Sequence, residues 1–166
     1  MNDYHDNLIR GGHIKEIVKT LLEKSGYAVS QYGYESTFSH IKNWLQQPDA
    51  RNSPTARRLR TSPDLLVYDD QRKDAMLVEI KMRNAPNEKS VMIQNVGQYK
   101  EFWNDAILVV AVPLGDMLYA QRICELETKE YYNVDRDFER FDELFRRVGR
   151  EDVSRFGEKA SQFIIR

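Results

Sequence analysis

Cysteine and histidine are scarce in this chain. Its 166 residues include one cysteine, Cys124, and three histidines, His5, His13 and His40. A lone cysteine excludes an internal disulfide, and so few histidines beside it leave no convincing ligand set for structural zinc or an iron–sulfur cluster. We interpret Cys124 as an isolated small apolar residue.

Long apolar runs are also missing. No stretch approaches the roughly 20 apolar residues that span a bilayer, and the amino terminus lacks the apolar core of a signal peptide. We therefore expect a cytoplasmic protein. With 41% hydrophobic and 31% charged residues, the composition argues against a disordered chain, and the length fits one domain, residues 1–166.

An excess of charge of one sign is likewise absent, since the net charge is −1. The charge is nevertheless uneven, because residues 51–60 carry four arginines and no acidic residue. This arm leads towards Asp64, and as a loop it would offer Arg57, Arg58 and Arg60 to the phosphate oxygens of a nucleic acid. A solvated loop is the competing interpretation.

Two apolar segments joined by a polar turn predict a β-hairpin, with strands Leu65–Tyr68 and Ala75–Lys81. Alternation along the second strand places Glu79 and Lys81 on one face. The hairpin should bring Asp64, which directly precedes the first strand, close to Glu79.

These three charged residues point to phosphodiester chemistry. Charges at the end of an apolar strand are costly unless they are paired or metal-bound. Mg²⁺ prefers oxygen ligands, so Asp64 and Glu79 would hold it, with Mn²⁺ as a substitute. Lys81 would orient the attacking water and stabilise the negative charge that develops on the phosphate. The alternative is a surface ion pair between Glu79 and Lys81 on an edge strand.

The rest of the chain is expected to form a mixed sheet with helices. Apolar spacing predicts helices between Gly12 and Ser25, at about 88–103 with Asn87 as the cap, at about 135–149, and a short one near 38–45. Further strands are expected at 27–32, at 107–112 after a helical crossover, and at 118–124 on the sheet edge. Residues 163–165 would form a terminal strand or a docking tail.

The order of helix, strand, hairpin, strand, helix and strand, together with Pro63-Asp64 and Glu79-Ile80-Lys81, resembles the PD-(D/E)XK nuclease superfamily over about residues 11–112. The likeness is greatest to small stand-alone members such as archaeal Holliday-junction resolvases. It implies a restriction-endonuclease-like α/β fold, a mixed β-sheet flanked by helices, with a C-terminal helical extension at about 130–166. It also implies that the Ile80 carbonyl is a further metal ligand.

The resemblance further implies a glutamate on the first helix. Glu16 is the candidate, and Glu35, after the first strand, is the alternative. Glu16 lies nearly opposite the apolar stripe of that helix, so a solvated surface residue is an equally good interpretation.

The helix after the lysine strand departs from one branch of the superfamily, in which a glutamine and a tyrosine stand four residues apart. Here Asn95 stands four residues before Tyr99. This departure argues against the exonuclease-type branch. Gln94 and Gln98 would share the polar face of this helix and contact DNA, although ordinary surface glutamines explain them more economically.

The sequence thus predicts a Mg²⁺-dependent deoxyribonuclease, an endonuclease rather than an exonuclease. A two-fold homodimer is expected, because two active sites would cut both strands of a duplex or junction. The competing hypothesis is a non-catalytic nucleic-acid-binding or assembly module that keeps the nuclease fold. A nucleotide-processing enzyme is disfavoured, because no Walker-type or GxGxxG loop is present.

Overall fold

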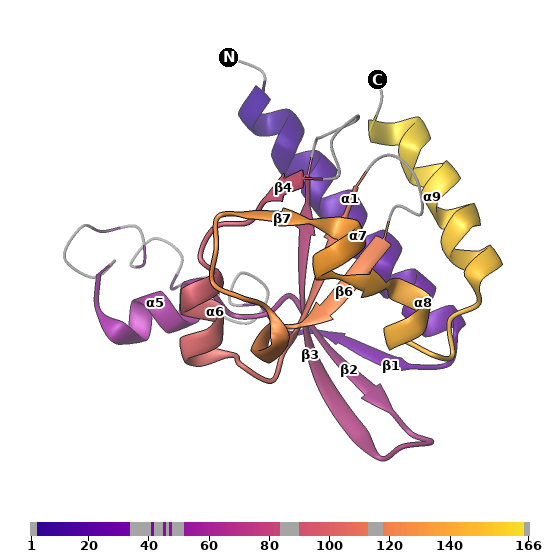
Figure 1. Ribbon diagram of the computed structural model, residues 1–166, viewed down its shortest axis with the longest axis horizontal. Helices are drawn as coiled ribbons and strands as arrows, with labels where there is room; N and C mark the ends of the chain where they lie inside the picture. The colour runs from indigo at the N-terminus through magenta and orange to yellow at the C-terminus, as the bar shows by residue number, and fades with distance from the viewer. Residues whose placement is uncertain are drawn as a thin grey trace.

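A six-stranded mixed sheet, in the order β1-β2-β3-β5-β6-β8, organises the computed structural model (Figure 1). The structure describes residues 3–33, 41, 45, 47, 52–83, 90–112 and 118–164, and side chains only between residues 11 and 158 of these. The strands are β1 (Ala28–Gln31), β2 (Leu65–Asp69), β3 (Asp74–Met82), β5 (Ile107–Ala111), β6 (Leu118–Arg122) and β8 (Glu139–Arg140).

Strand β3 lies inside this sheet, between an antiparallel neighbour, β2, and a parallel neighbour, β5. The predicted hairpin is confirmed, since β2 and β3 pair antiparallel with Leu65 opposite Val78. The predicted crossover is also confirmed, because β3 and β5 pair parallel with Ile80 opposite Val109. Strands β1 and β2, β5 and β6, and β6 and β8 pair antiparallel.

One face of the sheet is covered by α1 (Asp3–Lys24), α8 (Phe141–Leu144) and α9 (Arg150–Ile164). The apolar stripe of α1 predicted from the sequence lies in this core, with Val18 and Leu21 fully buried. Helices α1 and α9 pack against each other, and Figure 1 shows them together beside the sheet. The inward-facing Val78 and Ile80 of β3 complete this core.

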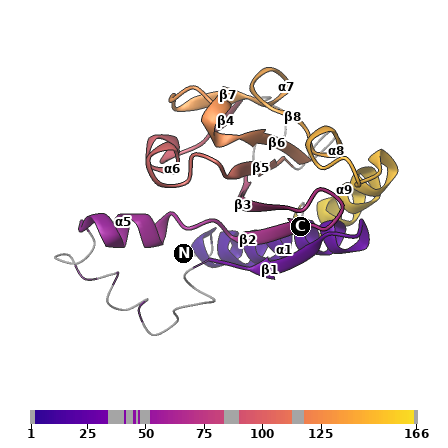
Figure 2. The same ribbon diagram turned by 90° about the horizontal axis from the view of Figure 1, so that it is seen from below.

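The other face is covered by α6 (Val96–Phe102), the 3₁₀ helix η2 (Ile123–Glu125), α7 (Val134–Asp137) and a two-stranded sheet of β4 (Ser90–Met92) and β7 (Tyr131–Asn133). Figure 2 shows the β4–β7 pair beyond β5 and β6, away from α1, and α6 beside β5. Leu108 and Val110 of β5, and Val112 just after the strand, pack here. The predicted mixed sheet flanked by helices is therefore confirmed.

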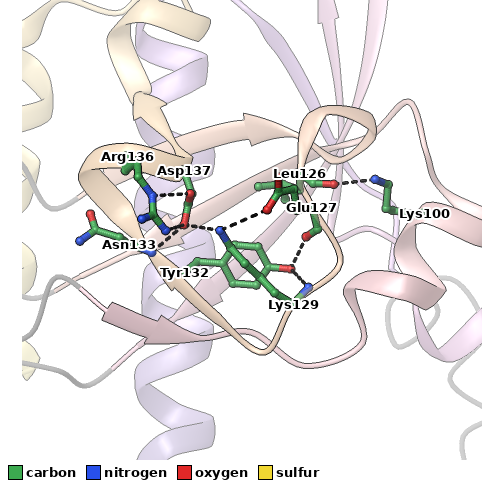
Figure 3. A network of polar contacts seen from close by, with 8 residues as sticks. All are labelled: Lys100, Leu126, Glu127, Lys129, Tyr132, Asn133, Arg136 and Asp137. Atoms are coloured by element: carbon green, nitrogen blue, oxygen red, sulfur yellow. Dashed lines mark hydrogen bonds and ion pairs between the residues drawn. The ribbon is translucent and has the colours of Figure 1, made fainter.

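A polar network holds the segment around β7 against α6 (Figure 3). The Tyr132 hydroxyl donates to the Glu127 carbonyl at 2.7 Å, and Lys100 of α6 donates to the Leu126 carbonyl at 2.5 Å. Lys129 pairs with Asp137 at 2.9 Å. Although partial burial raises the pKa of Asp137, hydrogen bonds from Arg136 and Lys129 bring it down to about 2. The position of α6 thus depends on residues far along the chain.

Several predicted elements differ in the structure. Gly11 and Gly12 lie inside α1 rather than before it. The helix predicted at 88–103 is a strand, β4, followed by the shorter α6, because Ser90–Met92 pairs with β7. The arginine-bearing segment is not a loop, since Pro54–Arg60 forms helix α5, capped by the Ser53 side chain.

The C-terminal predictions also need correction. The helix predicted at 135–149 is two short helices separated by β8, although its phenylalanines are buried as expected. Because β8 pairs with β6, β6 is not the sheet edge. Residues 163–164 continue α9 and form no strand. The short helix predicted near 38–45 falls largely outside the described residues.

Helices in the described part of the chain are all too short or too polar to cross a membrane.

Candidate active site

Asp64 ends the pairing between β2 and β3. Its N–H donates to the Val78 carbonyl at 2.9 Å, and its Oδ2 accepts the Ile80 N–H at 2.9 Å. The carboxylate thus accepts the hydrogen bond that a backbone carbonyl would accept if β2 were longer. Because the N–H and C=O of one strand residue point to the same side, the Ile80 carbonyl also faces the Asp64 side of β3.

Glu79 is a buried carboxylate, with an exposed fraction of 3%, on the face of β3 opposite to Val78 and Ile80. Its Oε1 accepts the Tyr99 hydroxyl at 2.9 Å and lies 2.5 Å from Lys81 Nζ. Its Oε2 is buried without a hydrogen-bond partner. Burial and then the charge of Asp64 raise the pKa of Glu79 to about 7, although Lys81 and Tyr99 oppose the shift. The Oε2 atom of Glu79 is therefore available to accept a hydrogen bond or to bind a cation.

Lys81 lies on the same face as Glu79, as the alternation of the strand predicts. Its ammonium group is 5.6 Å from the centroid of the Tyr99 ring. Burial favours the neutral amine, but the charge of Glu79 and the hydrogen bonds of this group outweigh it and raise the pKa of Lys81 above its usual value. Lys81 is therefore a fixed cation at neutral pH.

Tyr99 entered the sequence analysis only through its spacing from Asn95, and the structure gives it a polar role. Its ring is buried in α6 while its hydroxyl donates to Glu79. Burial, followed by the charge of Glu79, raises the pKa of Tyr99, so the hydroxyl stays protonated. A tyrosine on the helix after the lysine strand was the available signal in the sequence, but its spacing from a glutamine did not match.

Helix α1 brings Lys15, rather than Glu16, to Asp64. The Lys15 ammonium lies 2.5 Å from Asp64 Oδ1, and its side chain is 44% exposed. Glu16 points away with an exposed side chain, and its ion pair is with Lys19 at 3.8 Å. The prediction that Glu16 joins the catalytic set therefore lacks support in this geometry, because residues adjacent on a helix face different directions. Glu35 lies outside the described residues.

Arg83 is a second cation that the sequence did not single out. It follows Lys81 by two positions, and its guanidinium donates to the backbone carbonyls of Met82, at 2.9 Å, and Met92. Burial lowers the pKa of Arg83, and nearby Tyr99 and Glu79 oppose that shift. Alternation along β3 indicates that Arg83 extends the face of Glu79 and Lys81.

The predicted arginines lie on α5, which packs against α6 and ends just before Asp64. The Arg58 guanidinium lies 5.2 Å from the centroid of the Trp103 ring, and Arg57 lies 5.9 Å from that of Phe102. Arg58 and Arg60 are exposed. The Trp103 indole donates to the Thr61 hydroxyl at 3.3 Å, which attaches the end of α5 to α6. Positive charge therefore adjoins the Asp64 side of the site.

The two glutamines do not share a helix face as predicted. Gln94 is exposed in the turn that precedes α6, and Gln98 is a partly exposed residue of α6 itself. The β4 strand shortens the predicted helix and removes Gln94 from it.

The residues present fit a divalent cation in their chemistry. Within the described ranges, no cluster of three or more His, Cys, Asp and Glu side chains could hold a metal ion. Mg²⁺, however, is commonly held by one or two carboxylates with water and substrate phosphate. The buried, unpartnered Oε2 of Glu79 and the Ile80 carbonyl beside Asp64 are oxygen atoms of the required kind.

Comparisons with known proteins give likenesses in structure but none in sequence family. No protein-family model and no curated protein matches the chain. The 1.6 Å structure of Hjc, a Holliday junction resolvase from the archaeal hyperthermophile Archaeoglobus fulgidus, is similar with a TM-score of 0.49 and 14% sequence identity. The match covers 82% of this chain and 99% of that chain. A likeness at this level carries no argument about what this chain binds or cuts.

Proposed function

We propose that this protein is a metal-dependent endonuclease that hydrolyses phosphodiester bonds in DNA. Asp64, Glu79 and the Ile80 carbonyl would hold Mg²⁺, for which Mn²⁺ substitutes, and Lys81 would position the attacking water. The observation that carries the proposal is the buried Oε2 of Glu79, which has no hydrogen-bond partner, whereas Oε1 of the same carboxylate pairs with Lys81. A buried carboxylate oxygen is costly to leave unpaired, and a bound cation would remove that cost.

The metal, when bound, would lower the pKa of a water molecule and shield the scissile phosphate. Lys81 would act as a hydrogen-bond donor, because its raised pKa keeps it protonated and therefore unable to accept a proton from water. Its charge would stabilise the extra negative charge on the phosphate oxygens in the transition state. The oxygen of water would bond to phosphorus as the bond to the leaving oxygen breaks; the attacking water would lose a proton to solvent, and the leaving oxygen would take one from solvent.

DNA would lie across the basic surface that adjoins the site. Arg57, Arg58 and Arg60 of α5 would contact phosphate oxygens on the Asp64 side of the site. Gln94 and Gln98 stay candidates for contacts from the α6 side, as two separate positions rather than one helix face.

The assembly would be a two-fold homodimer in the cytoplasm, in which each copy cuts one strand. Analytical ultracentrifugation at micromolar concentration tests this part alone. A strict monomer that still cuts both strands would remove the dimer from the proposal and leave the chemistry in place.

One observation favours the alternative of a non-catalytic DNA-binding module with the same fold. Both carboxylates of the site already have a lysine partner, Lys15 for Asp64 and Lys81 for Glu79. Such pairs neutralise the two carboxylates without a metal. The alternative predicts DNA binding that no divalent cation affects.

The deciding experiment is cleavage of labelled duplex, single-stranded, flap and four-way-junction DNA with Mg²⁺ or Mn²⁺. We expect Asp64→Asn and Lys81→Ala to lower the rate by on the order of a hundredfold or more, since each removes a metal ligand or a transition-state charge. Asp74→Asn, an exposed position at the other end of β3, is the matched control and should cut at the wild-type rate. DNA binding without cleavage under any of these conditions would favour the alternative.

A further inference from the structure

The Lys15–Asp64 ion pair places an exposed cation on a carboxylate that we assign to a metal. We propose that Lys15 is a displaceable counter-cation of Asp64, which couples metal binding at this site to DNA binding. This inference rests on the proposed function. In the described structure, Asp64 is the sole ion-pair or hydrogen-bond partner of the Lys15 ammonium, at 2.5 Å.

The two lysines of the site are held differently. Lys81 is 29% exposed, belongs to the central strand and contacts both Glu79 and the Tyr99 ring. Lys15 is 44% exposed and reaches Asp64 from a separate helix. Water screens the 44% exposed ammonium of Lys15, and the long side chain loses freedom in forming the pair, so Lys15 is held less firmly than Lys81. The Asp64 side chain is only 13% exposed, so Lys15 would leave it when another cation takes its place, whereas Lys81 stays.

Charge balance explains why this exchange matters. With both carboxylates ionised, Asp64 and Glu79 contribute two negative charges, and Lys15 and Lys81 contribute two positive charges, so the four groups sum to zero. A neutral site attracts a divalent cation less strongly than a site with net negative charge. Lys15 also competes directly with the metal for Asp64 Oδ1.

Bound DNA would remove both hindrances to metal binding, namely the neutral charge of the site and the contact of Lys15 with Asp64. A phosphate diester brings one negative charge and offers its oxygens to the Lys15 ammonium, so Lys15 can exchange one anionic partner for another. Asp64 Oδ1 then becomes available, and the added negative charge favours the cation. Because coupling between two ligands is reciprocal, the metal should tighten DNA binding by the same factor.

The test measures Mn²⁺ binding to the free protein, with free Mn²⁺ followed by electron paramagnetic resonance. We expect Lys15→Gln to tighten Mn²⁺ binding by roughly three- to tenfold, the range that loss of one nearby surface charge allows. Lys15→Arg keeps the charge and should match the wild type. Lys19→Gln is the matched control, because it removes the same charge one turn along α1, where Lys19 faces Glu16 and Glu23.

A second measurement follows the coupling itself. Anisotropy of a fluorescent phosphorothioate duplex, shown to stay intact on a gel, gives DNA affinity with and without Mn²⁺. The factor by which Mn²⁺ tightens DNA binding should be smaller for Lys15→Gln than for the wild type or Lys19→Gln.

The outcomes separate this inference from the proposed function. Unchanged Mn²⁺ affinity in Lys15→Gln, or an equal gain in Lys19→Gln, overturns the role of Lys15 and leaves the metal site standing. Failure of both the wild type and Lys15→Gln to bind Mn²⁺, or binding that Asp64→Asn leaves unaltered, overturns the metal site and the role of Lys15 with it. A thermal melt followed by circular dichroism confirms that each variant is folded.

Discussion

The Tyr99 hydroxyl donates a 2.9 Å hydrogen bond to Oε1 of Glu79, so a helix of the crossover connection reaches back to the strand that precedes it. The bond joins two residues that are both about 3% exposed. One oxygen of Glu79 is thereby fixed in direction, while the other has no protein partner.

Tyr99→Phe should weaken Mn²⁺ binding by roughly tenfold, the low end of the range for outer partners of metal ligands. The lost hydrogen bond lowers the pKa of Glu79 in the wild type, so the variant would hold more of Glu79 protonated at neutral pH. Isothermal calorimetry checks the affinity. Tyr132→Phe is the control, since its hydroxyl also bonds inside the protein, to the Glu127 carbonyl. Both variants should lose about 1–2 kcal/mol of stability, but only Tyr99→Phe should lose metal affinity.

In the metal-free protein, the contribution of Glu79 to stability should fall as the pH rises from about 4.5 to about 7. Glu79 has a folded-state pKa near 7 against an ordinary value of 4.5, so in this window the folded state holds a proton that the unfolded state has released. In EDTA, the melting temperature of Glu79→Gln minus that of the wild type should therefore increase by about 3 °C or more between the two ends of this pH window.

Glu23→Gln, on the outer surface of α1, is the control for that titration and should show no such rise. A constant difference between Glu79→Gln and wild type across the same window would contradict the raised pKa.

Arg58→Gln should lower DNA affinity and reduce the slope of log affinity against log salt by about 1, as expected for one lost phosphate contact. Arg58 is exposed and lies over the Trp103 ring on the side of the site that α5 forms. Fluorescence anisotropy between 50 and 200 mM salt, roughly the range over which such contacts are resolved, gives both quantities. Arg155→Gln, a 66% exposed arginine of α9, should leave the slope unchanged. Equal effects of the two substitutions would remove α5 from the proposed DNA surface.

Two glycines, one within α1 and one just after it, should respond to alanine in opposite directions. Gly26 has a φ of 86°, and a Cβ there would collide with Arg147 Nη2, so Gly26→Ala should cost about 1–3 kcal/mol. Gly12 lies within α1, where an added Cβ would meet nothing within 4 Å, so Gly12→Ala should gain about 0.5–1 kcal/mol. Urea denaturation measures both. A loss of stability in Gly12→Ala would argue against a continuous α1.

The hairpin and its three charged residues were predictable because their signals are local. Alternation in β3, the polar turn before it and the preceding Pro63-Asp64 all lie close together in the sequence. The structure keeps this arrangement, with Leu65 opposite Val78 and Asp64 beside Ile80. A side-chain period of two leaves little choice of face once the strand is identified.

The β4–α6 region was not predictable from local signals. Met92, Val96, Tyr99 and Trp103 recur at helical spacing, yet Met92 lies in a strand because Ser90–Met92 pairs with Tyr131–Asn133. A partner far along the chain decides the conformation, and periodicity in one segment carries no information about it. The same applies to β8, which interrupts a helical pattern of phenylalanines by pairing with β6.

Lys15 shows the limit of a helical wheel. The wheel correctly placed Glu16 on the outer side of α1, but it could not indicate which neighbouring residue faces Asp64. That depends on how α1 packs across the sheet, through residues such as Val18 and Leu21. A helix rotated by one residue would present a different charge to the site.

The pairing of β4 with β7 makes the candidate active site depend on a segment far along the chain. A fragment that ended after β5 would still contain Asp64, Glu79 and Lys81, yet it would lack the strand that clamps β4 and the Leu126 carbonyl that accepts a hydrogen bond from Lys100 on α6. Limited proteolysis between β6 and β7 would therefore disturb Tyr99 and Glu79 before it disturbed the hairpin itself.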